Sequence, residues 1–170
     1  MNQYKKWLMT AVLAVLAALI LEAAIVVYVD PFFQYHAPLE DFPYLVDNQI
    51  NQNPGMATHM EYDSVILGSS MTVNFNTGWF QEVLGLNTIK LNYSGAYPKD
   101  QANIMERIFH SDNQIKTVFL GLDVMTCTGG VEETKYPIPD YLYDDVIWND
   151  AAYLWNKDVF LNYILRPMAD

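Results

Sequence analysis

An apolar run near the start of the chain is the most distinct pattern in the sequence. It extends from Trp7 to Val29, and Glu22 is the one charged residue inside it. A run of about 20 apolar residues is long enough to cross a bilayer as a helix, whereas the apolar part of a secretory signal is shorter. The bulky residues that follow it contain no small-residue cleavage site. The pattern therefore predicts a transmembrane anchor over residues 7–29.

Charged residues on either side of this run predict its orientation. Lys5 and Lys6 precede it, and Asp30 follows it. Because positively charged flanks stay on the cytoplasmic side, residues 1–6 are expected to form a cytoplasmic tail and the chain beyond Asp30 to lie outside the cell membrane. A carboxyl group is costly in hydrocarbon, so Glu22 lies near the far interface, faces a partner helix or is protonated. The pattern leaves these three alternatives open.

Beyond the anchor the pattern first becomes irregular and then alternates. Residues 30–60 contain four prolines with aromatic residues between them, which predicts an irregular connector with at most one helical turn. From residue 61 to residue 125, short apolar runs alternate with segments whose apolar residues recur at helical spacing. The predicted strands are 64–67, 88–93 and 117–123, and the predicted helices between them are 76–84 and 98–110.

This order of strands and helices predicts an α/β fold. Helical connections between strands form right-handed crossovers, which place the strands parallel in one sheet. After Asp123 the alternation ends, and residues 126–170 are predicted to form a loop followed by a helix over 150–165. Three strands make a small sheet with an exposed outer edge. We therefore expect a partial α/β domain over residues 61–125 and the sequence to be the front part of a longer protein.

The charge balance restricts the possible partners. The chain after residue 29 has seven Lys or Arg residues against nineteen Asp or Glu residues. It therefore lacks the basic surface that nucleic acid or an anionic membrane surface attracts. Cys127 is the only cysteine, which excludes an intrachain disulfide and a cluster of thiolate metal ligands. An external domain without disulfides fits a bacterial envelope.

Candidate chemistry lies at the end of the first predicted strand. The apolar run 64–67 stops at Gly68, and two hydroxyl residues, Ser69 and Ser70, follow it. A strand that ends in a glycine turn can expose a nucleophilic serine at the carboxyl edge of a sheet, where nearby backbone N–H groups stabilise an oxyanion. The alternative is an ordinary turn whose serines satisfy backbone groups. The Gly-Ser-Ser sequence by itself does not decide between the two.

The other two predicted strands also end in small or polar residues. Ser94 and Gly95 follow the second strand, and Gly121 and Asp123 lie at the end of the third. Ligands of parallel sheets bind beyond the carboxyl ends of the strands. We therefore expect these residues and Ser70 to meet at a common edge.

Taken together, these strand ends resemble the SGNH/GDSL hydrolase superfamily over about residues 62–123. The resemblance is to membrane-anchored envelope members, akin to the D-alanyl-lipoteichoic acid biosynthesis serine hydrolase and the alginate O-acetylation proteins. It implies a flavodoxin-like, SGNH-type parallel sheet behind the anchor. By position, Ser70 would be the catalytic nucleophile, and Gly95 would supply an oxyanion N–H together with the backbone of Ser70. Asp123 falls where the third block of the family has asparagine.

Two departures from the family bear on activity. An ionised Asp123 would repel an oxyanion, so this residue would instead be a strand-end cap or an acceptor behind the site. The Asp-x-x-His block of the family is missing, although a serine needs a neighbouring base to become nucleophilic. His36 and His59 precede the first strand and His110 ends a helix. We expect all three histidines to be structural and the base to come from a longer parent chain.

Two functions are therefore carried forward. The first is a membrane-anchored, extracytoplasmic serine esterase or acyltransferase that acts on envelope polysaccharide or teichoic acid through an acyl-enzyme on Ser70, without cofactor or metal. The alternative is a non-catalytic domain that anchors or docks on a polytopic membrane acyltransferase or on a glycan. A third possibility, a flavodoxin-like ligand-binding domain, lacks support from a glycine-rich phosphate loop.

Overall fold

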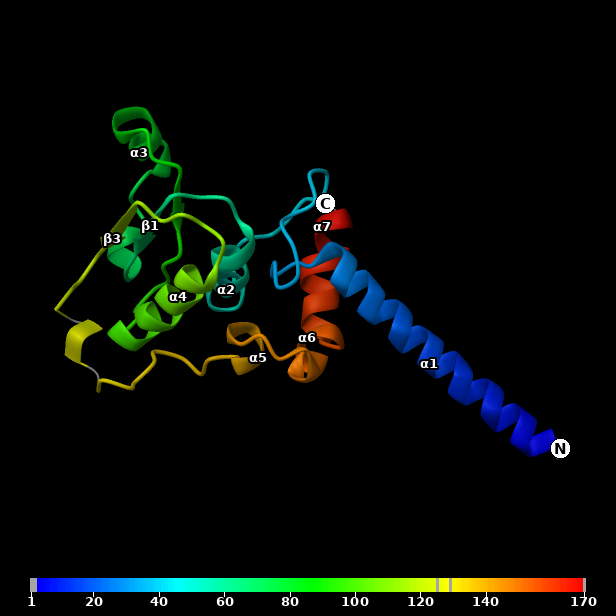
Figure 1. Ribbon diagram of the computed structural model, residues 1–170. Helices are drawn as coiled ribbons and strands as arrows, with labels where there is room; N and C mark the ends of the chain where they lie inside the picture. Colours follow the sequence, from blue (N-terminus) through cyan, green and yellow to red (C-terminus); the bar gives the residue numbers. More distant parts are fainter. Residues whose placement is uncertain (1–2, 125, 129, 170) are drawn as a thin grey trace. The chain divides into compact units, whose positions relative to one another are not determined.

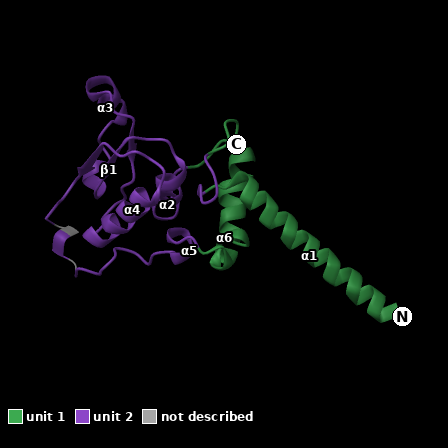
Figure 2. Cartoon of the chain, viewed as in Figure 1, with its two compact units in different colours: residues 1–31, 38–45, 146–170 green, residues 32–37, 46–145 purple. Residues whose placement is uncertain are grey.

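The computed structural model describes residues 3–124, 126–128 and 130–169, and the chain divides into two compact units (Figure 2). Unit 1 consists of residues 1–31, 38–45 and 146–170, and unit 2 consists of residues 32–37 and 46–145. Unit 2 contains the sheet, whereas unit 1 contains the long N-terminal helix.

Figure 1 shows the elements of both units. Unit 2 contains, in chain order, α2 (Gln49–His59), β1 (Ser64–Leu67), η1 (Ser70–Thr72), α3 (Thr77–Leu84), β2 (Thr88–Lys90), α4 (Pro98–His110), β3 (Thr117–Leu120), η2 (Thr126–Thr128) and α5 (Asp140–Tyr143). Unit 1 contains α1 (Gln3–Val29), η3 (Ile147–Asn149), α6 (Ala151–Leu154), η4 (Val159–Leu165) and α7 (Arg166–Ala169).

The three strands form one parallel sheet in the order β2-β1-β3. Ser64 at the start of β1 pairs with Thr88 of β2 and with Thr117 of β3, so the three strands start level. Helices α3 and α4 form the two crossovers. The predicted α/β arrangement with a three-stranded parallel sheet is confirmed, and the carboxyl ends of all three strands share one edge.

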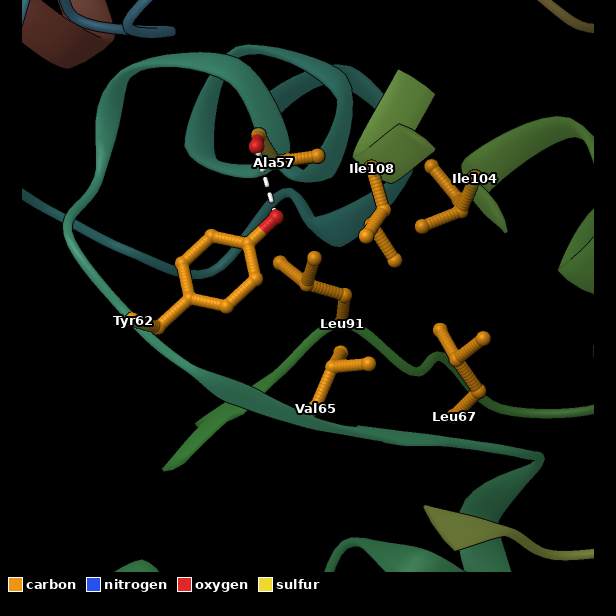
Figure 3. Packing of buried hydrophobic residues seen from close by; sticks show 7 residues of the cluster. All are labelled: Ala57, Tyr62, Val65, Leu67, Leu91, Ile104 and Ile108. Atoms are coloured by element: carbon orange, nitrogen blue, oxygen red, sulfur yellow. Dashed lines mark hydrogen bonds between the residues drawn. The ribbon is translucent and has the colours of Figure 1, made fainter. Parts of the chain in front are cut away.

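The hydrophobic core of unit 2 lies between one face of the sheet and helices α2 and α4 (Figure 3). Val65 and Leu67 point to this face because side chains alternate along a strand. The hydroxyl of Tyr62 donates to the carbonyl of Ala57 at 2.6 Å, and burial raises the pKa of Tyr62 to about 12. The buried members of the cluster are Ala57, Tyr62, Val65, Leu67, Leu91, Ile104 and Ile108.

The opposite face of the sheet is covered more thinly. Ile66 and Phe119 pair across β1 and β3, and they point away from the core cluster. Phe80 of α3 packs edge-on against Phe119, with 4.7 Å between the ring centroids. No residue of α3 is buried, and Trp79 and Val83 remain 60% and 78% exposed. This helix therefore presents most of its apolar side to the surroundings.

Both predicted crossover helices are present. Asn76 begins α3 by accepting a hydrogen bond from the N–H of Gly78 at 2.9 Å, and Gly85 ends it in a left-handed conformation with a φ of 67°. Helix α4 occupies the predicted residues 98–110. The second and third strands are shorter than predicted, because their ladders end at Lys90 and Leu120.

Helix α2 corrects the expectation of an irregular connector with at most one helical turn over residues 30–60. Pro54 lies inside this helix and has no N–H to donate to the carbonyl of Ile50 in the preceding turn. The hydroxyl of Tyr143, at the end of α5, donates to that carbonyl at 2.9 Å. The cost of placing a proline inside the helix is therefore partly offset by a side chain from a distant part of the chain.

Removing this hydroxyl should loosen α2. In Tyr143→Phe the carbonyl of Ile50 loses its donor, and we expect α2 to lose about 1–2 kcal/mol of local stability. Amide hydrogen exchange across residues 49–59 measures the loss. Tyr136→Phe is the control, because Tyr136 is exposed and its hydroxyl bonds to no other described residue. Equal protection of α2 in the two variants would contradict the role given to Tyr143.

Helix α1 is long and apolar enough to cross a membrane. Its side chains from Gln3 to Leu21 are exposed, apart from the half-buried Ala11. Toward its end the helix packs against α6 and η4, and Val26 and Val29 are buried. The helix therefore has a bare first part and a partly covered last part.

The helix predicted over residues 150–165 is broken into α6 and η4. Asn156 lies in the break, and its side-chain oxygen accepts the N–H groups of Asp158 at 2.9 Å and of Val159 at 3.4 Å. Because these N–H groups find a partner in a side chain, the chain can leave one helix and start another. Trp155, immediately before the break, donates its indole N–H to the carbonyl of Leu19 at 2.9 Å.

Candidate active site

A tightly packed turn follows β1 at the carboxyl edge of the sheet. The side chain of Thr72 fills the space beside two glycines, because a Cβ on Gly68 would lie 2.6 Å from Thr72 Cγ2 and a Cβ on Gly121 would lie 2.2 Å from it. Gly68 also has a φ of 148°, which residues with a side chain rarely adopt. Glycine at the ends of two neighbouring strands thus lets η1 fold against the sheet edge.

Hydrogen bonds fix the position of Thr72 in this turn. Its hydroxyl donates to the carbonyl of Ser69 at 2.8 Å and accepts from the side-chain amide of Asn92 at 2.6 Å. The same amide nitrogen lies 3.5 Å from the carbonyl of Ser69. Asn92 follows β2 and is buried. The segments that leave β1 and β2 are therefore joined by buried polar contacts.

Asp123 connects the end of β3 to the same turn. The hydroxyl of Ser69 donates to Oδ2 of Asp123 at 2.5 Å, a length typical of a hydrogen bond to a carboxylate. Ser69 is 2% exposed, so its hydroxyl is inaccessible to a substrate. Of the roles considered for Asp123, an acceptor behind the site agrees with this geometry.

Ser70 is the exposed serine of the pair. It begins η1, and Ser69 is the N-cap of that short helix. The hydroxyl of Ser70 makes no hydrogen bond to another described residue. It is therefore open to solvent at the carboxyl end of the central strand, while the side chains of its neighbours Ser69 and Thr72 are bonded and buried.

Gly95 lies in the segment after β2, and its surroundings are formed by Lys135. Gly95 has a φ of 75°, and a Cβ there would lie 3.1 Å from Cε of Lys135. The Lys135 ammonium lies 5.6 Å from the ring centroid of Tyr97 and 5.9 Å from that of Tyr136, which is within the range of cation–π attraction. Among the described residues, no contact joins Gly95 to the Ser70 hydroxyl.

Asp100 and Tyr93 form a buried polar pair near this lysine. Oδ2 of Asp100 accepts the backbone N–H of Tyr97 at 2.7 Å and that of Lys135 at 2.9 Å, which ties the loop to the start of α4. The Tyr93 hydroxyl does not meet a described acceptor in hydrogen-bond geometry. Burial and the nearby Asp100 raise the pKa of Tyr93 far above its ordinary value. Tyr93 therefore stays protonated at neutral pH and is unsuited to act as a general base.

The three histidines have structural surroundings. Each ring forms a hydrogen bond with a backbone carbonyl. His59 and His110 end α2 and α4, the helices that lead into β1 and β3, and so lie toward the amino edge of the sheet. Within the described part of the chain, no group of three or more His, Cys, Asp or Glu residues is arranged to hold a metal ion.

Comparison with known proteins identifies no relative: no protein-family model, curated protein or solved structure matches this chain. The chemical role of the carboxyl edge of the sheet therefore has to be inferred from the geometry of its residues. Hydrogen bonds bring Ser69, Thr72, Asn92 and Asp123 together, and Ser70 lies exposed beside them.

Three residues of this edge were missed in the sequence. Asn92 falls inside the strand predicted over residues 88–93, so its place after the strand emerges only because the observed strand ends at Lys90. Thr72 offered a weak signal, as a third hydroxyl residue behind Ser70. Lys135 lies in a loop with no regular pattern, and no local signal could have placed it beside Gly95.

The contact between Gly121 and Thr72 predicts a specific rescue. In Gly121→Ala the new methyl group would clash with Thr72 Cγ2, and we expect a destabilisation of about 1–3 kcal/mol. Thr72→Ser removes that Cγ2 and keeps the hydroxyl, so the double variant should lose less stability than the sum of the single variants. Amide hydrogen exchange in β1 and β3 measures these losses.

Gly130→Ala is the matched control for this experiment. A Cβ at Gly130 would lie 3.8 Å from Glu133, an ordinary contact, so this change should leave the exchange of β1 and β3 unaltered. Losses from Gly121→Ala and Thr72→Ser that simply add would show that the two residues do not compete for the same space.

Proposed function

We propose that this chain is a membrane-anchored, extracytoplasmic domain of SGNH type that forms an acyl-enzyme on Ser70. It acts as an esterase or acyltransferase on cell-envelope polysaccharide or teichoic acid. Helix α1 is the anchor, with Lys5 and Lys6 on the cytoplasmic side. The observation that carries the proposal is the exposure of Ser70 on a turn that buried neighbours hold in place.

Accessibility and fixed position are both needed for a nucleophile. Ser69 has the fixed position, but its hydroxyl is buried and bonded to Asp123. Ser70 is accessible, and its backbone is set by the hydrogen bonds of Ser69 and Thr72. Ser70 is therefore the serine that an acyl donor can reach.

Two backbone N–H groups are available for an oxyanion. Neither the N–H of Ser70 nor that of Gly95 donates to a described acceptor. These are the two donors that the resemblance to the SGNH superfamily implies. An N–H group without an internal partner can stabilise the charge that develops on the carbonyl oxygen when serine attacks.

The proposed reaction also requires a base, which the described residues do not supply. Strand β3 pairs with β1 alone within the described part of the sheet. An additional strand beside β3 would end at the same edge and could deliver the missing histidine and acid. Apolar side chains at the end of this strand and after it support such a neighbour, since Leu120, Leu122 and Val124 are 45%, 65% and 84% exposed.

Labelling with a fluorophosphonate tests the proposed nucleophile. We expect the folded full-length protein to label at Ser70 and Ser70→Ala to abolish the label, because the reagent reacts with an activated serine hydroxyl. Ser94→Ala is the matched control, since Ser94 is an exposed serine in the segment after the neighbouring strand. A folded protein that remains unlabelled, or that labels equally in Ser70→Ala, would contradict the assignment.

A second candidate function is a non-catalytic partner of a polytopic membrane acyltransferase. The hydrogen bond between Ser69 and Asp123 favours it, because this carboxylate stabilises the turn where an active site would need a donor. The exposed apolar side of α3, with Trp79 and Val83, offers a surface for such a partner.

Co-purification separates the two functions. If the second is correct, a membrane acyltransferase should co-purify with the chain, and Ser70→Ala should leave the complex intact because the serine has no chemical role. Replacing α1 by an unrelated membrane span should abolish the complex if the anchor makes the contact. Failure of any acyltransferase to co-purify with the unaltered protein would count against this second function.

A further inference from the structure

Residues 146–169 form the last part of unit 1, and we call this segment the collar. Its elements α6 and η4 pack against α1, and the contact reaches back along that helix as far as Leu19. Trp155 donates its indole N–H to the carbonyl of Leu19 at 2.9 Å, and the Tyr153 hydroxyl donates to Asp30 at 2.8 Å. The two acceptors are about 16 Å apart along the helix, at 1.5 Å per residue. Both α1 and the collar belong to unit 1 (Figure 2).

This contact conflicts with a membrane span over residues 7–29. Leu19 lies near the middle of that range, so such a span would carry Trp155 to the centre of the bilayer. Lys157 and Asp158 lie two and three positions after Trp155 and would enter hydrocarbon with it. Charged side chains facing lipid at that depth are strongly disfavoured. The covered part of α1 therefore does not belong inside the hydrocarbon layer.

The bare part of α1 has the length that a span requires. From Gln3 to Leu21 the side chains are exposed, apart from the half-buried Ala11. This stretch is about 28 Å long as a helix, close to the roughly 30 Å of a hydrocarbon core. Lys5 and Lys6 lie in its first turns, where long charged side chains extend to the lipid headgroups on the cytoplasmic side. Glu22 is the first residue beyond this stretch, which removes the carboxyl group from the hydrocarbon.

We propose that the membrane boundary crosses α1 at Leu21 and Glu22, and that the collar lies in the lipid–water interface, in contact with phospholipid. Trp148 is 93% exposed, the most exposed large apolar side chain of the described residues, and it bonds to no other described residue. Tryptophan side chains prefer the membrane interface. This inference rests on the membrane anchor of the proposed function.

The composition of the collar supports phospholipid as the molecule that its exposed surface contacts. Its charges balance, because Asp150 and Asp158 stand against Lys157 and Arg166, whereas the whole chain has a net charge of −11. A surface without net negative charge is not repelled by anionic lipid. Its exposed apolar side chains belong to the same unit as the bare part of α1, and they are Val146, Ile147, Trp148, Trp155, Leu161, Leu165 and Met168.

Spin-label accessibility in phospholipid bilayers tests this placement. The full chain carries Cys127→Ser and one nitroxide, at Trp148→Cys in the collar, at Leu13→Cys in the bare part of α1, or at Trp79→Cys in unit 2. These positions are all exposed, and collisions with oxygen and with a water-soluble nickel chelate are measured. We expect the label at position 148 to collide with nickel several-fold less than the label at 79, and with oxygen less than the label at 13. Ile147→Cys serves as a second collar position should Trp148→Cys misfold.

The outcomes separate this inference from the anchor itself. Nickel collisions at positions 147 and 148 that equal those at 79, with position 13 shielded, would overturn the collar placement and leave the anchor standing. Shielding of the collar labels from both oxygen and nickel would mean that protein covers them, which also overturns it. Free access of nickel to position 13 would refute the anchor of the proposed function.

Discussion

The candidate site depends on one steric fit, the packing of Thr72 into the space that Gly68 and Gly121 leave open. A Cβ on either glycine would overlap the threonine methyl group, so the turn after β1 can approach the end of β3 because a glycine directly follows each strand. The parallel register places these strand ends side by side. The position of Ser70 therefore depends on two glycines that are far apart in the sequence and on the parallel pairing that brings them together.

That fit also divides the roles of the two serines. The hydroxyl of Ser69 is directed to Asp123, and this hydrogen bond ties the turn to the end of β3. Ser70, the next residue, is left exposed with its hydroxyl and its N–H unbonded to described residues. The Asp123 carboxylate therefore accepts from the buried serine and not from the exposed one.

The sequence predicted those elements whose signals are local. Helix α4 has its proline at the start and its apolar stripe in register, so its bounds were predicted. Prediction failed where distant groups decide the structure. Pro54 indicated a break, but Tyr143 satisfies the carbonyl that the proline leaves. The sequence likewise could not show which serine is buried, because Asp123, fifty-four positions away from Ser69, determines this.

Helix α1 shows the same limit for a membrane segment. Apolar composition identifies a helix that can span, but Val12 and Val26 look alike in the sequence although Val12 is 50% exposed and Val26 is fully buried. Contact with protein and contact with lipid favour the same side chains. Glu22 marks the change between the exposed and the covered part of the helix, since the collar begins to cover α1 near this residue. Of the alternatives open for this carboxyl group, the proposed boundary at Leu21 and Glu22 corresponds to a position at the interface.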